Sequence, residues 1–464
     1  MTIRRSLDQV ALHFVTPVWG REFTQTFLEV MLPSLLAPGN LPAIPNKEQC
    51  VYKIFTLEND AQTIKGSSAF AALASLMTVE VNIIQEPKEN KYYRASDCYR
   101  ESSRQASLAQ AAVAMFGPDV VVADGSVDAM VRLLRNGKRA ILVMGVRTIK
   151  ESIIPELLSR YAEDGCLRVP KRQLAKLALD HLHPITESHM FDGDSPRYHA
   201  SGLFWRVGDE GLLLHAFHLH PIVVHAPTFP GDFEGTIDND LMEKSNLPDE
   251  AVHIVADSDE FLCFEMSSRD YSFDTPDRGG MLSLVSSVQY STSRFHRKVV
   301  RVPIRVHAGK TTESKWSQTE RRAQYVISRI LDACDESAYL AAWSRGELKN
   351  LPLLTRFRFG IQAIEDGAVD VKKYFHARPR VRAKAFLAFL IITGFGIWSS
   401  IRLPAPGWLK WLSNRADMYL KAKGFSTQVY SCYALRTIAA VFVVTARQLR
   451  TSMGFSARDP SRRP

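Results

Sequence analysis

Five short apolar runs divide the first third of the chain, and stretches with helical spacing separate them. The runs do not alternate between apolar and polar residues, so they predict strands buried on both faces of a parallel sheet. The predicted strands are Leu12 to Trp19, Val51 to Thr56, Val79 to Ile84, Val120 to Ala123 and Ala140 to Val146. The predicted helices are Glu22 to Leu36, Asp60 to Leu76, Ser102 to Phe116 and Val127 to Asn136. This alternation predicts a doubly wound, mostly parallel α/β domain over residues 1–150.

The pattern becomes less regular in residues 151–310, which we interpret as the second half of the same α/β unit. Asp209 to Phe217 has helical spacing, and His220 to Pro227 reads as a strand that ends in proline. An acid-rich loop follows, and two further apolar runs predict strands at Val252 to Asp257 and Phe261 to Met266. Residues 311–371 read as a helical connector, because Ser317 to Ser344 has helical spacing.

A basic tail, residues 372–464, ends the chain. It holds 17 lysines and arginines but only two acids, Asp417 and Asp459, whereas the rest of the chain carries more acids than bases. Ala385 to Ile401 is a run of 17 uncharged residues, flanked by arginines and Lys384. As a helix this run would be ~25 Å long, slightly shorter than a bilayer core. Basic residues interleaved with apolar runs and tryptophans favour an anionic membrane lipid as the partner, rather than nucleic acid.

Cysteine usage and the N-terminal residues indicate the compartment. The six cysteines are widely spaced and include no C-x-x-C pair, which argues against a disulfide framework and against a zinc knuckle. Polar residues interrupt the apolar positions of the first 20 residues, which is atypical of a cleaved signal peptide. We therefore expect a folded body at the cytoplasmic face of the cell membrane, with a membrane-associated helical tail.

The order of strands and acids over residues 11–227 resembles the GT-A class of nucleotide-sugar glycosyltransferases. In that class the loop after the first strand meets the nucleotide; in this sequence that loop is Thr16 to Gly20, with Thr16 and Pro17 as candidate contacts. An acid after the second strand contacts the base or ribose, a position that Glu58 or Asp60 would take. Alternatively, Glu58 and Asp60 only stabilise the start of a helix through its dipole.

The resemblance also implies a site for a divalent metal, Mn²⁺ or Mg²⁺, at the end of the fourth strand. The class places an Asp-x-Asp motif there, and this sequence has Asp124-Gly125-Ser126 after the run Val120 to Ala123. Ser126 stands where the second acid is expected, and a hydroxyl is a weaker ligand for a hard cation than a carboxylate. The competing explanation is a turn that caps the next helix.

Many inverting members of the class carry an acid pair at the start of a helix that precedes a strand with a terminal proline. Asp209 and Glu210 match that layout, and the resemblance implies that one of them, by preference Glu210, is the catalytic base. Their alternative role is helix stabilisation. His218 and His220 precede the same strand and are further candidate metal ligands, or structural histidines. The loop Gly231 to Asp240 is either a cover for the acceptor or a solvated surface loop.

Together these features predict an enzyme that moves a sugar from a nucleotide sugar to a surface-glycan or lipid-linked acceptor. The sequence has no G-x-G-x-x-G after the first strand, no G-x-x-x-x-G-K-[ST], no H-E-x-x-H and no G-x-S-x-G. Dinucleotide, P-loop, zincin and α/β-hydrolase sites are therefore not expected. Two alternatives remain open: a catalytically degenerate scaffold of the same fold in a polysaccharide-assembly complex, and a sugar nucleotidyltransferase.

Overall fold

The computed structural model describes residues 11–85, 91–191, 201–225, 230, 233, 236–271, 284, 285, 288, 291–344 and 415. The chain divides into two compact units. The first comprises Met1–Pro276 with Ser291–Ser328, and the second comprises Asp277–Tyr290 with Arg329–Pro464. Every described strand belongs to the first unit. Within the second unit, the thiol of Cys334 lies 3.6 Å from the carbonyl oxygen of Val285, and both residues are buried.

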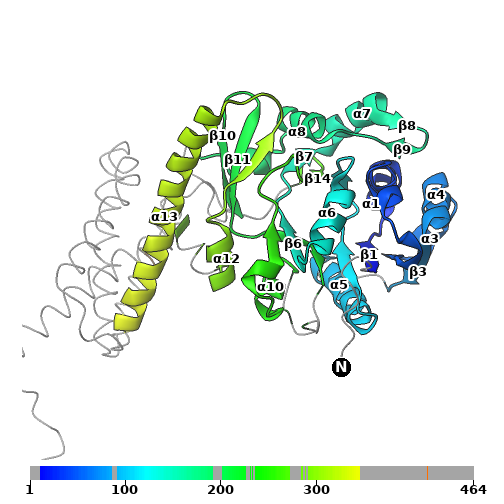
Figure 1. Cartoon of the computed structure of the whole chain (residues 1–464), viewed down its shortest axis with the longest axis horizontal. Coiled ribbons are helices and arrows are strands. Elements are labelled where there is room, and N and C mark those ends of the chain that lie inside the picture. The colour runs from blue at the N-terminus through cyan, green and yellow to red at the C-terminus, as the bar shows by residue number, and fades with distance from the viewer. Residues whose placement is uncertain are drawn as a thin grey trace, which may run out of the picture. The chain divides into compact units, whose positions relative to one another are not determined.

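A seven-stranded, mostly parallel sheet forms the centre of the first unit (Figure 1). Its order is β13-β6-β12-β4-β1-β2-β3, and β12 runs antiparallel to both of its neighbours. The chain passes from β1 through β2 to β3 at one edge and then returns to β4 on the other side of β1. The strands are β1 Leu12–Pro17, β2 Val51–Thr56, β3 Thr78–Ile83, β4 Ala112–Met115, β6 Ala140–Val143, β12 His220–Val224 and β13 Val252–Ile254.

Helices connect these strands and cover both faces of the sheet. A π-helical segment, η2 (Phe27–Met31), joins α1 to α2 without a break. Short 3-10 helices, η3 Leu41–Ala43, η4 Lys47–Gln49 and η5 Asp249–Ala251, lie in the connections. The α-helices of this layer are α1 Arg21–Thr26, α2 Leu32–Leu35, α3 Glu58–Lys65, α4 Ser68–Leu76, α5 Lys91–Leu108 and α6 Ser126–Arg135.

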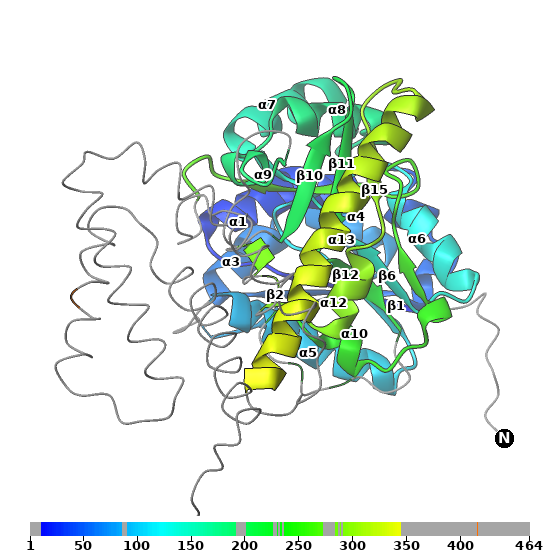
Figure 2. The same cartoon turned by 90° about the vertical axis from the view of Figure 1, so that its left-hand side faces the viewer.

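Three smaller sheets add to the central one. The first contains β10 Gly202–Arg206, β11 Gly211–Ala216 and β15 Ile304–His307; the second contains β5 Val120–Val122, β14 Cys263–Ser267 and β7 Arg147–Ile149; β8 Ala162–Glu163 and β9 Cys166–Leu167 form the third. The remaining helices are α7 Lys150–Tyr161, α8 Lys171–Asp180, α9 Pro184–Glu187, α10 Leu241–Lys244, α12 Arg294–Val299 and α13 Glu313–Ser344. In Figure 2 the first half of α13 runs alongside the sheet β10-β11-β15.

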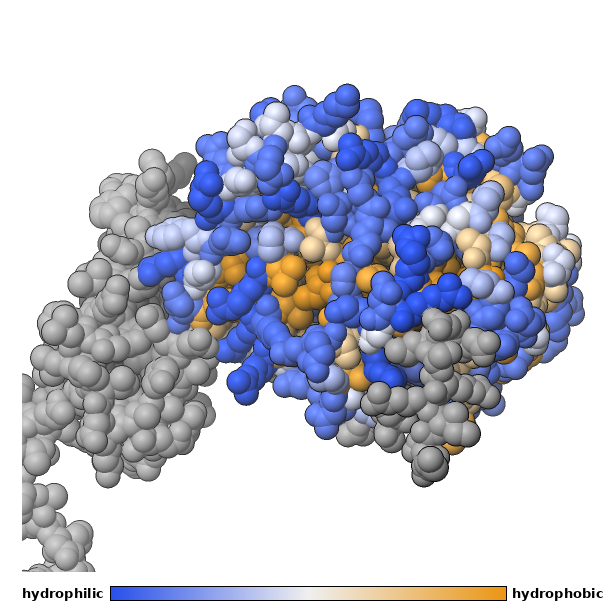
Figure 3. Space-filling model, viewed as in Figure 1, coloured by the Kyte–Doolittle hydropathy of each residue, from blue (hydrophilic) through white to orange (hydrophobic). Residues whose placement is uncertain are grey.

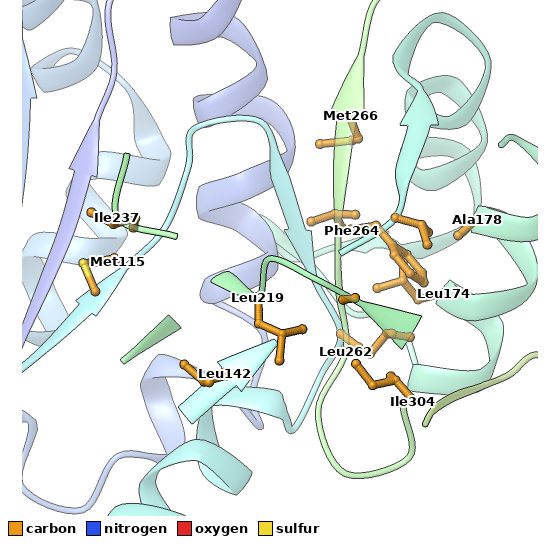
Figure 4. Close-up of a cluster of buried hydrophobic side chains, with 14 of the residues drawn as sticks. Met115, Leu142, Leu174, Ala178, Leu219, Ile237, Leu262, Phe264, Met266 and Ile304 are labelled. Atoms are coloured by element: carbon orange, nitrogen blue, oxygen red, sulfur yellow. The ribbon is translucent and has the colours of Figure 1, made fainter. Parts of the chain in front are cut away.

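Two apolar clusters hold the layers together, one on each face of the central sheet. Successive side chains of a strand point to opposite faces, so Phe14 belongs to one cluster and Val15 to the other. In Figure 4, which draws the cluster that contains Val15, Leu174 of α8 approaches Phe264 of β14. On the face shown in Figure 3, the coloured surface is largely hydrophilic, and apolar residues gather in a hollow near its centre.

The predicted strands are confirmed within three residues, but the fourth, Val120 to Ala123, does not belong to the central sheet. Ser102 to Phe116 was expected to be one helix; α5 ends at Leu108, and Ala112–Met115 is β4, which pairs with β1 and β12. Alanine and methionine favour helices in isolation, but here burial at the centre of the sheet outweighs that preference. The run Val120 to Ala123 forms β5, which pairs with β14 in the small sheet β5-β14-β7.

The predicted helix from Asp209 to Phe217 is also wrong. This segment contains β11, an antiparallel strand that pairs with β10 and β15. Every residue of β11 is buried, because the strand is covered on both faces, and a strand of that kind lacks the alternation that distinguishes it from a helix. Gly208, with a φ of +63°, makes the turn that leads from β10 into β11.

The predicted membrane-associated tail falls outside the described residues, apart from Arg415. In the part of the chain that is described, no helix has the length and apolar character needed to span a bilayer.

Candidate functional site

A cavity of about 780 Å³ opens at the carboxyl ends of the parallel strands. Pro17 is the last residue of β1 at this edge, Asp119 lies four residues after β4, and Met144 directly follows β6. Because β12 is antiparallel, its first residue, His220, reaches the same edge. The chain order reverses between β1 and β4, and crevices at such a reversal are where open α/β sheets bind their ligands. The topology therefore marks this cavity as the candidate site.

The small sheet β5-β14-β7 forms one wall of the cavity. Val120, Glu265 and Arg147 lie in one row across its three strands, and all three residues line the cavity. The backbone N–H of Met266 donates to the carbonyl of Asp119 at 2.8 Å, which fixes Asp119 at the end of this row. At the usual spacing of neighbouring strands, the backbones of Val120 and Arg147 are ~10 Å apart. The wall thus separates the acid after β4 from the cation of β7.

Two ion pairs lie in the cavity wall. The guanidinium of Arg147 is 2.6 Å from a carboxylate oxygen of Glu265, and it also lies over the ring of Tyr271 at 4.7 Å. Lys150, the first residue of α7, pairs with Glu22 of α1. The charged residues of the described lining are therefore two cations and four acids: Arg147, Lys150, Glu22, Asp119, Asp238 and Glu265. The cavity carries a net negative charge before anything binds.

Aromatic side chains form another part of the lining. Trp19 comes from the loop after β1, Tyr92 and Tyr99 come from α5, and Phe204 comes from β10. The hydroxyl groups of Tyr92 and Tyr271 are hydrogen-bonded to each other across the site. Burial, followed by this hydrogen bond, raises the pKa of Tyr92. A flat ligand would find apolar ring surface here, next to the charged wall.

Both predicted metal-ligand histidines line the cavity. His220 contacts the carbonyl oxygen of Met115 through Nε2 at 2.9 Å, and His218 contacts the carbonyl oxygen of Asp238 through Nδ1 at 3.4 Å. His296 binds the same Asp238 carbonyl at 3.0 Å, with its ring centroid 4.3 Å from that of His218. Burial and the neighbouring His296 lower the pKa of His218. One ring nitrogen of each predicted ligand is thus held by backbone, and metal binding by these histidines stays a prediction.

Asp124 and Ser126 do not line the cavity. The Asp124 carboxylate accepts the backbone N–H of Gly39 at 2.7 Å and lies 3.2 Å from Nε of Arg168. Ser126 is buried and bonds the backbone of Leu262. The end of the fourth strand is Met115 rather than Ala123, so the residue that takes the expected position is Asp119. The sequence contains a signal for it, because Gly117 and Pro118 end the apolar run directly before this acid.

The predicted nucleotide contacts divide into two groups. Pro17 lines the cavity, whereas Thr16 is fully buried behind it, with its hydroxyl 2.8 Å from that of Tyr52. Asp60 accepts the backbone N–H of Gly20 at 2.8 Å, and Glu58 is exposed at the start of α3. Neither acid lines the cavity, so any effect of Asp60 on a ligand acts through the loop that contains Trp19.

Asp209 and Glu210 lie in the turn between β10 and β11, where both are exposed, and neither lines the cavity. A carboxylate oxygen of Glu210 accepts the backbone N–H of Lys310 at 2.9 Å. The premise of the base assignment, a helix that starts at this pair, is therefore wrong. Of the acid-rich loop, residues 233 and 236–240 are described, and Asp238 lines the cavity.

One further group of side chains has the spacing of a cation site. Ligand atoms of Asp257, Asp259 and His307 lie within 4.8 Å of one another. Arg172, however, already binds the Asp259 carboxylate through two nitrogens, at 2.7 to 3.2 Å. These hydrogen bonds hold the pKa of Asp259 below its ordinary value. The group is outside the cavity lining, so it is a weaker candidate for a substrate-linked metal than the acids inside.

The chain has no sequence match to a known family, and its structural similarity to known proteins is low-scoring. No family model and no curated protein matches the sequence. Among solved structures, the chain is similar to TarS of S. aureus, with 10% identity and a TM-score of 0.29 over 92% of this chain and 55% of that one. It spans about half the length of TarS. It is also similar to the mannosyltransferase PcManGT from Pyrobaculum calidifontis in complex with GDP-Man and Mn²⁺, with 9% identity, a TM-score of 0.26, and 76% and 79% of the two chains covered.

Proposed function

We propose that this chain is a glycosyltransferase that moves a sugar from a nucleotide sugar to an acceptor hydroxyl in the cavity at the β1–β4 reversal. The position of Asp119 is the observation that carries the proposal. It follows β4, the fourth strand of the central sheet, and it lines the cavity. In the class that the sequence resembles, this is where an acid meets the metal-bound diphosphate. A volume of about 780 Å³ is within the usual range for a site that encloses a small ligand.

The charges of the cavity favour a divalent metal as cofactor. Four acids and two cations line its described part, so a diphosphate would meet net repulsion. A bound Mn²⁺ or Mg²⁺ would reverse the local charge, and carboxylate oxygens are the ligands that such hard cations prefer. Asp119 would hold the metal, which would supply charge stabilisation for the departing diphosphate. His218 and His220 remain further candidate ligands, as the sequence suggested.

Within this proposal, the chain's own residues orient the acceptor and take its proton. Asp238 is the acid of the cavity best suited to be the base, since His296 and His218 hold its backbone carbonyl and so fix the residue. A base must lie within hydrogen-bonding reach of the attacking oxygen. We therefore move this role from Glu210, which lies in an exposed turn, to Asp238.

Calorimetry with uridine and guanosine diphosphate, with and without manganese, tests the donor site. Asp119→Asn should weaken nucleotide binding at least ~10-fold and remove the response to manganese. Asp124→Asn, a second acid near the same strands but outside the lining, should leave both unchanged. Equal affinities and equal manganese responses in the two variants would refute the assignment of Asp119.

A panel of nucleotide sugars tests the reaction itself. The wild type should hydrolyse or transfer at least one donor, and Asp238→Asn should lower turnover ~100-fold or more while nucleotide affinity stays the same. Nucleotide binding by wild type without turnover of any donor would favour the non-catalytic scaffold instead.

We further propose that the acceptor is a glycan or a lipid-linked molecule at the cytoplasmic membrane face. Support comes from the sequence of the tail, where uncharged runs alternate with lysines and arginines. Deleting residues 383–464 should then move the protein from the membrane fraction to the supernatant. Membrane binding that survives the deletion, or full-length protein that never sediments with membranes, would contradict this proposal.

A further inference from the structure

The side chains of the two cations in the cavity are less exposed to solvent than those of their carboxylate partners. The side chain of Arg147 is 15% exposed, against 35% for Glu265. Lys150 is 18% exposed, whereas Glu22 is 64% exposed. In both pairs the cation is the more enclosed partner, and the acid is the partner nearer to solvent. A carboxylate that stays largely in solvent adds little stability to an ion pair, so an incoming anion displaces the exposed Glu22 at small cost and the more enclosed Glu265 at a larger one.

Arg147 is also rigidly placed. Its backbone N–H donates to the hydroxyl of Thr186 at 3.0 Å, and the same hydroxyl donates back to its carbonyl at 2.8 Å. The guanidinium packs over Tyr271 and hydrogen-bonds the Ser267 hydroxyl. A planar guanidinium held against a ring is suited to bind two oxygens of a phosphate or carboxylate at once.

Lys150 places a second positive charge three residues further along. It is the first residue of α7, a helix of 12 residues whose N-terminus adds partial positive charge. Both cations line the cavity. Arg147 lies two strands away from Val120, the neighbour of Asp119, in the row Val120-Glu265-Arg147. The cavity therefore has a carboxylate end at Asp119 and a cationic end at Arg147 and Lys150.

We propose that Arg147 and Lys150 form an anion subsite of the cavity that binds a phosphate or carboxylate group of a substrate, with Glu22 and Glu265 as the counter-ions that this group displaces. This subsite rests on the proposed function, because only that function identifies the bound anion as part of a substrate. The group belongs either to the acceptor or to the diphosphate of the donor, and the same chemistry serves both.

Calorimetric titration of the full chain with inorganic phosphate, at constant ionic strength, tests the subsite. Arg147→Gln and Lys150→Gln should each weaken phosphate binding ~10-fold or more, because each loses a charge-assisted contact. Glu22→Gln should tighten it ~2- to 5-fold, because a competing counter-ion is removed. The matched controls are Arg172→Gln and Lys176→Gln, which break a carboxylate pair of the same type outside the cavity and should change nothing.

Two outcomes would overturn the subsite. One is wild-type phosphate affinity in both cation variants, and the other is weaker binding in Glu22→Gln. If Arg147→Gln fails to fold, Lys150→Gln and Glu22→Gln still decide the question, because Glu22 is largely exposed and its replacement removes no buried contact.

Repeating the titration with saturating nucleoside diphosphate and manganese identifies the source of the anion. If phosphate still binds, the subsite is not occupied by the nucleoside diphosphate and serves the acceptor. If phosphate is excluded, the nucleoside diphosphate occupies the subsite, which then serves the donor. Phosphate binding that depends on Arg147, in a protein that transfers no sugar, would leave the subsite standing and refute the proposed function. Sugar transfer by the wild type, together with undiminished phosphate binding in both cation variants, would support the proposed function and refute the subsite.

Discussion

The Asp60 carboxylate accepts a hydrogen bond of 2.8 Å from the backbone N–H of Gly20. Asp60 lies in the first turn of α3, after β2, and Gly20 ends the loop after β1, so this bond joins the ends of two neighbouring strands. Gly20 has a φ of +82°, a conformation that glycine adopts without strain. The loop that follows Pro17 and contains Trp19 is therefore braced by the acid that the sequence resemblance assigned to the nucleotide.

Replacing Asp60 with alanine should weaken nucleoside diphosphate binding ~3- to 10-fold, because the loop loses a charge-assisted hydrogen bond worth ~1 kcal/mol at an exposed position. Glu58→Ala is the matched control: it removes an exposed acid from the same turn and should leave the affinity unchanged. Calorimetry measures both. An equal loss in the two variants would indicate a general charge effect instead of a bracing role.

Asp124→Asn should lower the free energy of unfolding by ~1–3 kcal/mol. Its carboxylate is mostly enclosed, accepts the Gly39 N–H and pairs with Arg168, and a weakened acceptor leaves that N–H poorly satisfied. Urea unfolding followed by circular dichroism gives the value. Asp128→Asn, an exposed partner of Arg132 within one helix, should cost ~0.5 kcal/mol or less. Comparable losses for both would contradict a structural role specific to Asp124.

Stability should fall as the pH drops below ~6.5, and His215 should account for part of that fall. His215 donates through Nδ1 to the Val300 carbonyl at 2.7 Å, and its buried Nε2 has no hydrogen-bond partner among the described residues. Burial lowers the pKa of His215, so below ~6.5 the unfolded chain binds a proton that the native ring does not. Stability is therefore full above this pH and declines below it.

Melting temperatures at pH 7.5 and 5.5 measure this effect. His215→Gln should reduce the difference between the two temperatures without abolishing it, because burial also lowers the pKa of His13, His183, His218 and His225. His253→Gln is the control, since His253 is partly exposed and already has an acceptor in Glu260. An unchanged pH dependence in His215→Gln would show that protonation of this ring does not oppose folding.

Arg305 should hold the first half of α13 against β15. Its guanidinium bonds Glu313 and Glu320 and lies 5.3 Å from the ring of Trp316, which is fully buried. Glu320→Gln should lower the free energy of unfolding by ~1–2 kcal/mol, because that carboxylate is enclosed. Glu313→Gln should cost ~0.5 kcal/mol or less, because Glu313 is 70% exposed. The reverse order in urea unfolding would refute this account.

The hydrophobic pattern alone was sufficient for the layered α/β architecture of the first third of the chain. The inner strands of the central sheet, among them β1, β2 and β6, are buried on both faces, and such strands appear in the sequence as short apolar runs. This is why Val51–Thr56 was predicted to the residue and β1 and β6 within a few residues. The acids at the start of α3 could also be recognised from the sequence, because their preference for a helix N-terminus is a local property of the chain.

Only the tertiary structure decided which strand is the fourth and which acids meet the cavity. Ala112–Met115 and Gly211–Ala216 are apolar segments that local pattern cannot separate from helices; their pairing with β1, β10, β12 and β15 made them strands. The fourth strand of the central sheet begins eight residues before the predicted one, so the acid that follows it at the site is Asp119 and not Asp124. The pairing of Arg147 with Glu265, 118 positions away, was equally beyond the sequence. Long-range contacts of this kind depend on packing of the whole chain, which no local window contains.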